Sequence, residues 1–171
     1  MDIEMVSSAR APADVEELYR EHAVGLIRLA MLMVGDGPTA EDVVQDAFLG
    51  LHDRWRSLRD PAAALTYLRS AVLNRCRSVL RRRAVASRFR QPYQPPAWSA
   101  EDCAIDGQER SAVLTAIARL PRRQREVLAL RFYCDLPEEE IARTLRISRG
   151  TVSSTTSRAL AALAKLLEDA T

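Results

Sequence analysis

Apolar residues recur every three or four positions through most of the chain, the spacing that gathers them on one face of an α-helix. Leu18, Leu26 and Leu29 are an example from the first such segment. Glycine and proline clusters, such as Gly35–Pro38, separate the segments. No run of strand type interrupts the pattern. The expected helices span residues 14–34, 39–55 (with Thr39 as N-cap), 61–87, 106–119 and 121–133, and two shorter helices follow between 136 and 163.

Closely spaced prolines divide these helices into two groups. Pro92, Pro95 and Pro96 cannot lie inside a helix, so the segment around them is a linker. Its Tyr93 and Trp98 either fold back on a domain or contact a partner. We therefore expect an all-α fold of two small helical domains joined by a flexible linker. The expected divisions are a tail (1–12), a first domain (13–88), the Pro-rich linker (89–106) and a second domain (107–169).

The last two expected helices resemble a helix-turn-helix. Ser148 is a good N-cap for the second of them. Val152, Ala159, Leu160 and Leu163 are expected to form its buried face. The opposite face carries short hydroxyl side chains and arginines, which suit phosphates and base edges in a major groove. An ordinary helical hairpin with a polar outer face is the alternative. The expected DNA contacts are Arg149, Thr151, Ser153, Ser154, Ser157 and Arg158.

Charge is unevenly distributed, although the net charge is only +2. The second expected helix has an acidic exposed face that is either solvated or docks a basic partner. The third helix ends in an arginine cluster, with seven arginines and no acid between Arg75 and Arg90. One or two cations would suit the negative end of the helix dipole. Seven favour contact with nucleic acid, since arginine binds phosphate and guanine through two parallel hydrogen bonds.

Several functional classes are not supported by the composition. The three cysteines, Cys76, Cys103 and Cys134, are widely spaced, which argues against a disulfide framework or a zinc site. Neither a signal peptide nor a membrane-spanning segment is expected, which favours a cytoplasmic protein. A nuclease would need acids such as Asp42, Asp46 and Asp53 to form a metal site, and no phosphate loop or ligand cluster accompanies them. We expect neither an enzyme nor a cofactor.

Three motifs in order resemble the extracytoplasmic-function (group 4) sigma factors of bacterial RNA polymerase, most closely an actinobacterial subgroup. The first motif is Ala40–Phe48, AEDVVQDAF, and the second is Leu120–Val127, LPRRQREV. The third is Glu140-Ile141-Ala142 followed by Gly150-Thr151-Val152. Each motif alone is weak. Together, with an arginine-rich helix and a linker between them, they extend the resemblance over nearly all of residues 15–167.

The resemblance implies a role for each group of residues. The second helix would bind the β′ clamp of core RNA polymerase. The segment before the third helix, and that helix itself, would contact the −10 promoter element and assist melting, which requires a pocket for an extruded base. The helix-turn-helix would bind the −35 element. The implied polymerase contacts are Glu41, Gln45, Asp46 and Leu49, and the implied −10 contacts are Arg56, Arg59, Tyr67, Asn74, Arg77 and Arg81.

Two departures from the family pattern bear on DNA binding. Members commonly carry Lys-Ser-Arg after Gly-Thr-Val, where this chain has Ser153-Ser154-Thr155. Two cations fewer predict weaker isolated −35 binding and a shallower salt dependence. Pro137 also stands where a capping serine is usual, and Asp135 is the alternative cap.

The two competing functions imply different binding partners, which distinguish them. The sigma-factor interpretation implies core polymerase (β′ clamp and β flap), promoter DNA, an anti-sigma regulator and a stress or envelope signal. A stand-alone helix-turn-helix regulator would instead bind duplex DNA tightly without polymerase. The acidic second helix and basic third helix favour the sigma factor, because a simple repressor needs neither.

Overall fold

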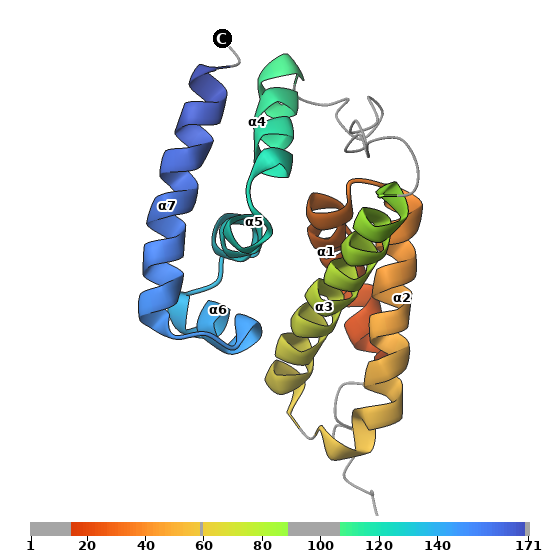
Figure 1. Ribbon diagram of the computed structural model, residues 1–171. Helices are drawn as coiled ribbons and strands as arrows, with labels where there is room; N and C mark the ends of the chain where they lie inside the picture. Colours follow the sequence, from red (N-terminus) through yellow and green to blue (C-terminus); the bar gives the residue numbers. More distant parts are fainter. Residues whose placement is uncertain (1–14, 59, 89–106, 170–171) are drawn as a thin grey trace, which may run out of the picture.

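The computed structural model describes residues 15–58, 60–88 and 107–169, and these form helices without strands. The first group contains α1 (Val15–Val34), α2 (Gly37–Arg54), the short η1 (Trp55–Ser57) and α3 (Pro61–Ser87). The second contains α4 (Gly107–Arg119), α5 (Arg122–Leu128), the π-helical turn η2 (Ala129–Tyr133), α6 (Glu138–Leu145) and α7 (Arg149–Glu168). The predicted all-α fold is confirmed (Figure 1).

The start of α2 differs from the prediction. Asp36, not Thr39, is the N-cap, and its Oδ1 accepts a hydrogen bond from the Thr39 amide at 2.9 Å. Pro38 lies in the first turn of the helix, where a proline costs nothing because the first amides of a helix have no intrahelical partner. The cluster that ends α1 therefore also begins α2, with Gly35 at φ 81° making the turn.

The helices α1, α2 and α3 pack around a core of fully buried aliphatic side chains, among them Leu29, Leu51 and Leu68. Leu73 is also fully buried, although the apolar stripe predicted for α3 omitted it. Leu65 and Leu80, which that stripe included, are only half-buried. The buried cluster that contains Leu73 also includes residues of the second group of helices, and the sequence pattern of one helix does not reveal how many neighbours surround it.

In the second group, α6 and α7 form a helix-turn-helix against α5. Ile141 and Val152 are fully buried, and the predicted cap is confirmed because Ser148 Oγ accepts the Thr151 amide at 3.1 Å. Arg146 ends α6 in the left-handed conformation, at φ 55°. Pro137 precedes α6 without any side-chain cap, so Asp135 does not take that role.

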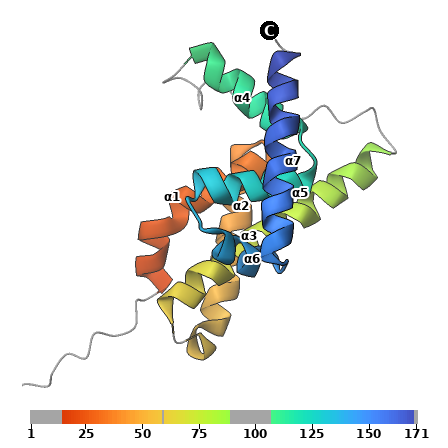
Figure 2. The ribbon, with the colours of Figure 1, turned by 90° about the vertical axis from the view of Figure 1, so that its left-hand side faces the viewer.

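The two groups lie against each other. Helices α5 and α6 contact α1 and α3 (Figures 1 and 2), and α4 also touches α1. One cluster of buried apolar residues runs through both groups, from Leu29 and Val72 to Val127, Leu130 and Ile141. The described helices therefore share a core, a feature that the predicted pair of linked helical domains did not include.

Candidate nucleic-acid interface

The exposed face of α7 carries every −35 contact that the sequence predicted. All six side chains are exposed: Arg149, Thr151, Ser153, Ser154, Ser157 and Arg158. The buried Val152 and Ala159 hold the opposite face of the helix against its neighbours. Short polar side chains and two guanidinium groups on one open helix face can reach phosphates and base edges.

Two predictions about α7 are wrong. Leu160, expected inside, is 44% exposed, and Thr155, expected to replace a DNA-contacting arginine, is buried at 4% exposure. Thr155 lies on the buried side of α7, and that helix packs closely on α5 and α6. The predicted loss of two cations from the DNA-facing side therefore reduces to one position, Ser153, in this chain.

The face of α2 predicted to bind polymerase is open. Glu41, Gln45, Asp46 and Leu49 are all exposed, and Leu49 is 65% exposed although it is a large apolar side chain. The backbone carbonyl of Asp46 accepts a hydrogen bond from Arg75 on α3 at 2.8 Å. This arginine thus fixes α2 against α3 beneath the exposed acidic face.

The residues predicted to contact the −10 element fall into different environments. Arg56 and Arg81 are exposed, and Arg59 lies outside the described residues. Tyr67 is half-buried between α2 and α3, with the Arg54 guanidinium 5.9 Å from the centre of its ring. Asn74 is exposed but bonded to Arg77, whose Nη1 donates to Asn74 Oδ1 at 2.8 Å.

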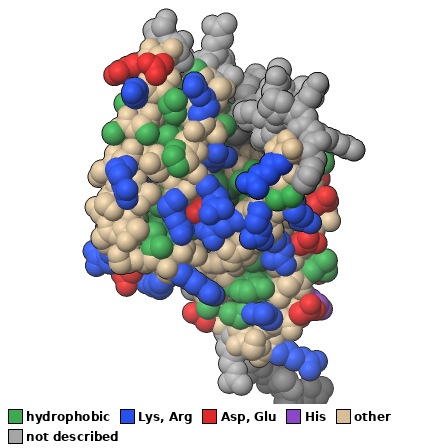
Figure 3. Space-filling model, viewed as in Figure 1, with side chains coloured by type: hydrophobic (Ala, Val, Ile, Leu, Met, Phe, Trp, Pro, Cys, Tyr) green, Lys and Arg blue, Asp and Glu red, His purple; other side chains and the backbone are tan. Residues whose placement is uncertain are grey.

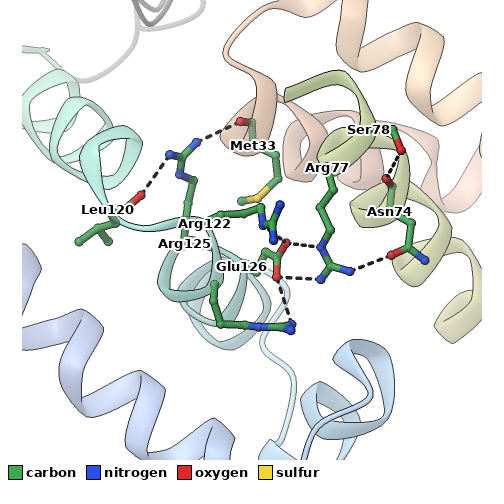
Figure 4. Close-up of polar contacts among 9 residues, drawn as sticks. Met33, Asn74, Arg77, Ser78, Leu120, Arg122, Arg125 and Glu126 are labelled. Carbon is green, nitrogen blue, oxygen red and sulfur yellow. Dashed lines mark hydrogen bonds and ion pairs between the residues drawn. The ribbon is translucent and has the colours of Figure 1, made fainter. Parts of the chain in front are cut away.

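The most buried charge in this region is Glu126 on α5, with 1% of its surface exposed. Arg77 donates to it through Nε and Nη2, at 2.6 and 2.8 Å (Figure 4). Hydrogen bonding to Glu126 raises the pKa of Arg77. Arg122 and Arg123 approach the same carboxylate at 3.9 and 3.3 Å. In the sequence Glu126 is part of the motif Leu120–Val127, and nothing in its spacing predicts that it pairs with α3.

Three further polar contacts join the two groups of helices. Ser70 Oγ donates to the Thr144 carbonyl at 2.8 Å, and Arg69 lies 3.6 Å from Glu140. Arg125 Nη1 donates to the Met33 carbonyl at 3.0 Å, while its Nη2 donates to carbonyls at the end of α4 (Figure 4). Figure 3 shows basic side chains gathered across the middle of this face, where the two groups meet.

Part of the arginine cluster of α3 holds the fold together. Arg83 donates to the Val34 carbonyl at 2.7 Å, to Asp36 Oδ2 at 2.5 Å and to Thr39 Oγ1 at 2.9 Å. It thereby ties the end of α1 to the start of α2. Burial alone would raise the pKa of Asp36, but the hydrogen bonds from Thr39 and Arg83 lower it below the usual value.

An apolar groove of about 330 Å³ runs along the second group of helices. Phe132 on η2 is 64% exposed beside it, and the exposed Leu160 of α7 forms part of its wall. Leu32 of α1 completes the lining. The exposure of Leu160 is thus part of a larger apolar surface.

The described residues show few features of a catalytic or metal-binding site. Burial raises the pKa of the Cys76 thiol to about 12 and also raises that of Cys134, so both are poor nucleophiles. Across residues 15–58, 60–88 and 107–169, no group of three potential ligands is placed to hold a metal ion. Within the same ranges, every helix is too short or too polar to cross a membrane.

Both groups of helices match families of known proteins. The family model described as Sigma-70 region 2 matches residues 18–86, and that described as Sigma-70, region 4 matches residues 110–163. The RNA polymerase sigma-E factor of Streptomyces avermitilis is 32% identical over 91% of this chain and 86% of its own length. The ECF RNA polymerase sigma factor SigM of Mycobacterium tuberculosis is 33% identical, over 89% and 76%.

Two solved structures share the fold. One is the sigma factor RpoE from Bartonella quintana in complex with the anti-sigma factor NepR. It matches with a TM-score of 0.75 and 20% identity, over 90% of this chain and 98% of that one. The other is CnrH in complex with the cytosolic domain of CnrY, with a TM-score of 0.69 and 22% identity over 92% and 89%.

Proposed function

The chain belongs to the sigma-70 family of RNA polymerase sigma factors, in its extracytoplasmic-function group, and we propose that three of its helices divide the work of promoter initiation. In this proposal α2 binds the β′ clamp of core polymerase, α3 contacts the −10 element, and α7 binds the −35 element. The protein directs promoter-specific transcription. It acts in the cytoplasm, where its polymerase and promoter are, and carries no catalytic activity of its own.

The observation that carries this proposal is the separation of three unlike surfaces on one small scaffold. The exposed face of α2 is acidic with one large apolar side chain, Leu49. The exposed face of α7 is hydroxyl-rich with arginine at both ends. The C-terminal half of α3 is basic. A protein that must hold a partner protein and two stretches of DNA at once needs three such surfaces, whereas a simple repressor needs one.

In vitro transcription with core polymerase on a genomic promoter library tests the function. We expect transcripts that depend on the protein and share an upstream motif. Asp46→Ala together with Gln45→Ala should abolish them, because both residues lie on the exposed face of α2 and support no described core contact. Tight duplex binding by the protein alone, with no dependent transcript, would instead support a stand-alone helix-turn-helix regulator.

The apolar groove beside α7 is the proposed site for the β flap of polymerase. Its apolar walls include Phe132 and Leu160, which are too exposed to serve the core. Phe132→Asp should reduce transcription from −35-dependent promoters while leaving the binding of isolated duplex DNA unchanged. An equal loss in both assays would assign Phe132 to DNA binding or folding.

We also propose an anti-sigma protein as the regulator of this factor. The support is its fold, which is shared with the sigma factors of two complexes: RpoE bound to an anti-sigma factor and CnrH bound to CnrY. Affinity purification from the native host should recover such a protein in the absence of the inducing stress. Recovery of polymerase alone under every growth condition would contradict this part of the proposal.

A further inference from the structure

In the arrangement described above, each nitrogen of the Arg77 guanidinium already donates a hydrogen bond within the protein, although the side chain keeps 25% of its surface exposed. Nε and Nη2 donate hydrogen bonds to the two carboxylate oxygens of Glu126, and Nη1 donates to Asn74 Oδ1. This two-point contact has the geometry with which arginine binds a phosphate. Glu126 thus occupies the group that a DNA phosphate would bind, and Asn74, another predicted −10 contact, is held in the same network.

The covering of α3 does not depend on this ion pair alone. Ser70 and Arg69, both about two turns before Arg77 in the helix, meet Thr144 and Glu140 of α6. Arg125 reaches across to the end of α1. The shared apolar cluster lies beneath these contacts. The second group of helices therefore contacts α3 at both ends of the stretch from residue 69 to residue 77.

The surroundings of Glu126 allow the contact to open. A buried carboxylate that loses its only cation is strongly destabilising. Glu126 has two other cations, Arg122 and Arg123, one turn away on its own helix. When α5 moves away from α3, these arginines remain with Glu126, and Arg77 alone is released.

We propose that the contact between Arg77 and Glu126 is an autoinhibitory latch. In the free protein, Glu126 holds the guanidinium that −10 DNA requires, and DNA binding on α3 begins only after the second group of helices has moved away. Core polymerase, by holding the two groups apart, would then expose the DNA-binding side of α3. This inference rests on the −10 role proposed for Arg77.

The experiment measures the free protein by small-angle scattering and by binding to a fluorescein-labelled fork-junction DNA made from a promoter found by the transcription assay. Glu126→Gln removes the charge of the latch. Ser70→Gln inserts bulk at the same interface without changing any charge, and Ser70→Ala is its matched control. Glu139→Gln is a second control, because Glu139 pairs only with the exposed Arg143 on its own helix.

We expect Glu126→Gln and Ser70→Gln to raise the radius of gyration and to tighten fork binding. If the open form is about a tenth of the free protein, the gain is up to about tenfold. Glu139→Gln should change neither quantity, and Ser70→Ala, which loses one hydrogen bond without adding bulk, should change both by less than Ser70→Gln. Circular dichroism monitors the helicity of each variant. If Glu126→Gln fails to fold, the result for Ser70→Gln alone tests the latch. Folded variants with unchanged dimensions, or open variants with unchanged affinity, would overturn the latch.

Measuring promoter opening by Arg77→Gln in the assembled holoenzyme distinguishes failure of the latch from failure of the proposed −10 role. There, polymerase holds the domains, so only the DNA contact of Arg77 is tested. If Arg77→Gln impairs promoter opening while Glu126→Gln leaves the free protein closed, the −10 role stands and the latch is wrong. If Arg77→Gln has no effect on opening, the −10 role fails, and the latch fails with it.

Discussion

At the scale of single residues, arginines that look alike in the sequence differ in their contacts. Arg83 binds three acceptors within the first group of helices, Arg77 binds Glu126, and Arg81 is exposed. The clustering correctly indicated a basic surface but overstated it, because part of it holds helices together. A run of arginines does not reveal which members face acceptors from distant parts of the chain.

The Asp36–Arg83 pair makes the stability of the folded protein depend on pH in the acidic range. Because the pKa of Asp36 is lowered in the folded protein, the pair contributes above pH 3.8, its ordinary value, and the contribution is lost as pH falls through the folded pKa. Asp36→Asn keeps a capping side chain but removes the charge. We expect it to cost about 1 kcal/mol at pH 7, since the pair is partly exposed.

Urea unfolding of Asp36→Asn and the native protein at several pH values measures this effect. The difference in free energy of unfolding should shrink steadily below pH 4. A difference that stays constant down to pH 2 would mean that the charge of Asp36 contributes nothing and that its capping geometry alone matters.

Ser153 offers a test of the proposed DNA binding by α7 and of its dependence on salt. It is exposed on the predicted DNA-facing side, so Ser153→Lys adds one phosphate contact. Each such contact changes the slope of log affinity against log salt by about 0.9. Titration of −35 duplex at several salt concentrations should show a slope steeper by about that amount.

Thr155→Arg is the contrasting variant at the second position where the family carries a cation. Since Thr155 is buried, an arginine there should lower stability without steepening the salt slope. A steeper slope in a fully folded Thr155→Arg protein would show that this position reaches DNA after all.

At the scale of elements, the apolar spacing predicted the helices well and their contacts poorly. The expected spans of α1 and α3 agree closely with the structure, since both have long periodic stripes. The start of α2 was misplaced because Gly37-Pro38 indicates a break as readily as a first helical turn. Leu73 is buried in an apolar cluster that includes residues of both groups of helices, and such distant pairing is not encoded in local periodicity.

Gly25 offers a test of helix propensity separate from packing. It lies exposed within α1, and a methyl group added there meets nothing within 4 Å. Gly25→Ala should therefore raise the free energy of unfolding by about 0.5–1 kcal/mol.

Gly50 in α2 is the matched control, measured in the same thermal unfolding series. A methyl group there lies 3.1 Å from the Tyr67 hydroxyl and 3.2 Å from Arg75 Nη2. Gly50→Ala should raise the free energy of unfolding by less than Gly25→Ala does, because the Tyr67 and Arg75 side chains must shift to admit the methyl group. Equal gains at both positions would indicate that α2 and α3 pack more loosely than described.

At the scale of the whole molecule, the sequence correctly predicted two helical units and their family but not their shared core. The surfaces of α2 and α7 were predictable because exposed polar faces depend only on local spacing. The pairing of Glu126 with Arg77 was not, since it depends on how two distant units meet. The sequence thus revealed the separate surfaces, and the structure revealed that one of them is partly engaged by the other unit at Arg77.

A common core predicts cooperative unfolding of both units. In calorimetry at neutral pH, the native protein should unfold in one transition with equal calorimetric and van't Hoff enthalpies. Glu126→Gln should split it into two overlapping transitions, because the units lose their strongest polar link. Two separate transitions in the native protein would contradict the shared core.

Arg146, which ends α6 in the left-handed conformation, suggests a trade between stability and activity. A side chain in that conformation costs roughly 1–2 kcal/mol, and glycine avoids the cost. The side chain of Arg146 is exposed in the turn between the two helices that flank the DNA-reading surface. A protein selected for stability alone would favour glycine there. In the proposed −35 binding mode, the arginine places a cation beside the DNA at the expense of a more stable fold, and directed evolution for heat resistance should find this position early.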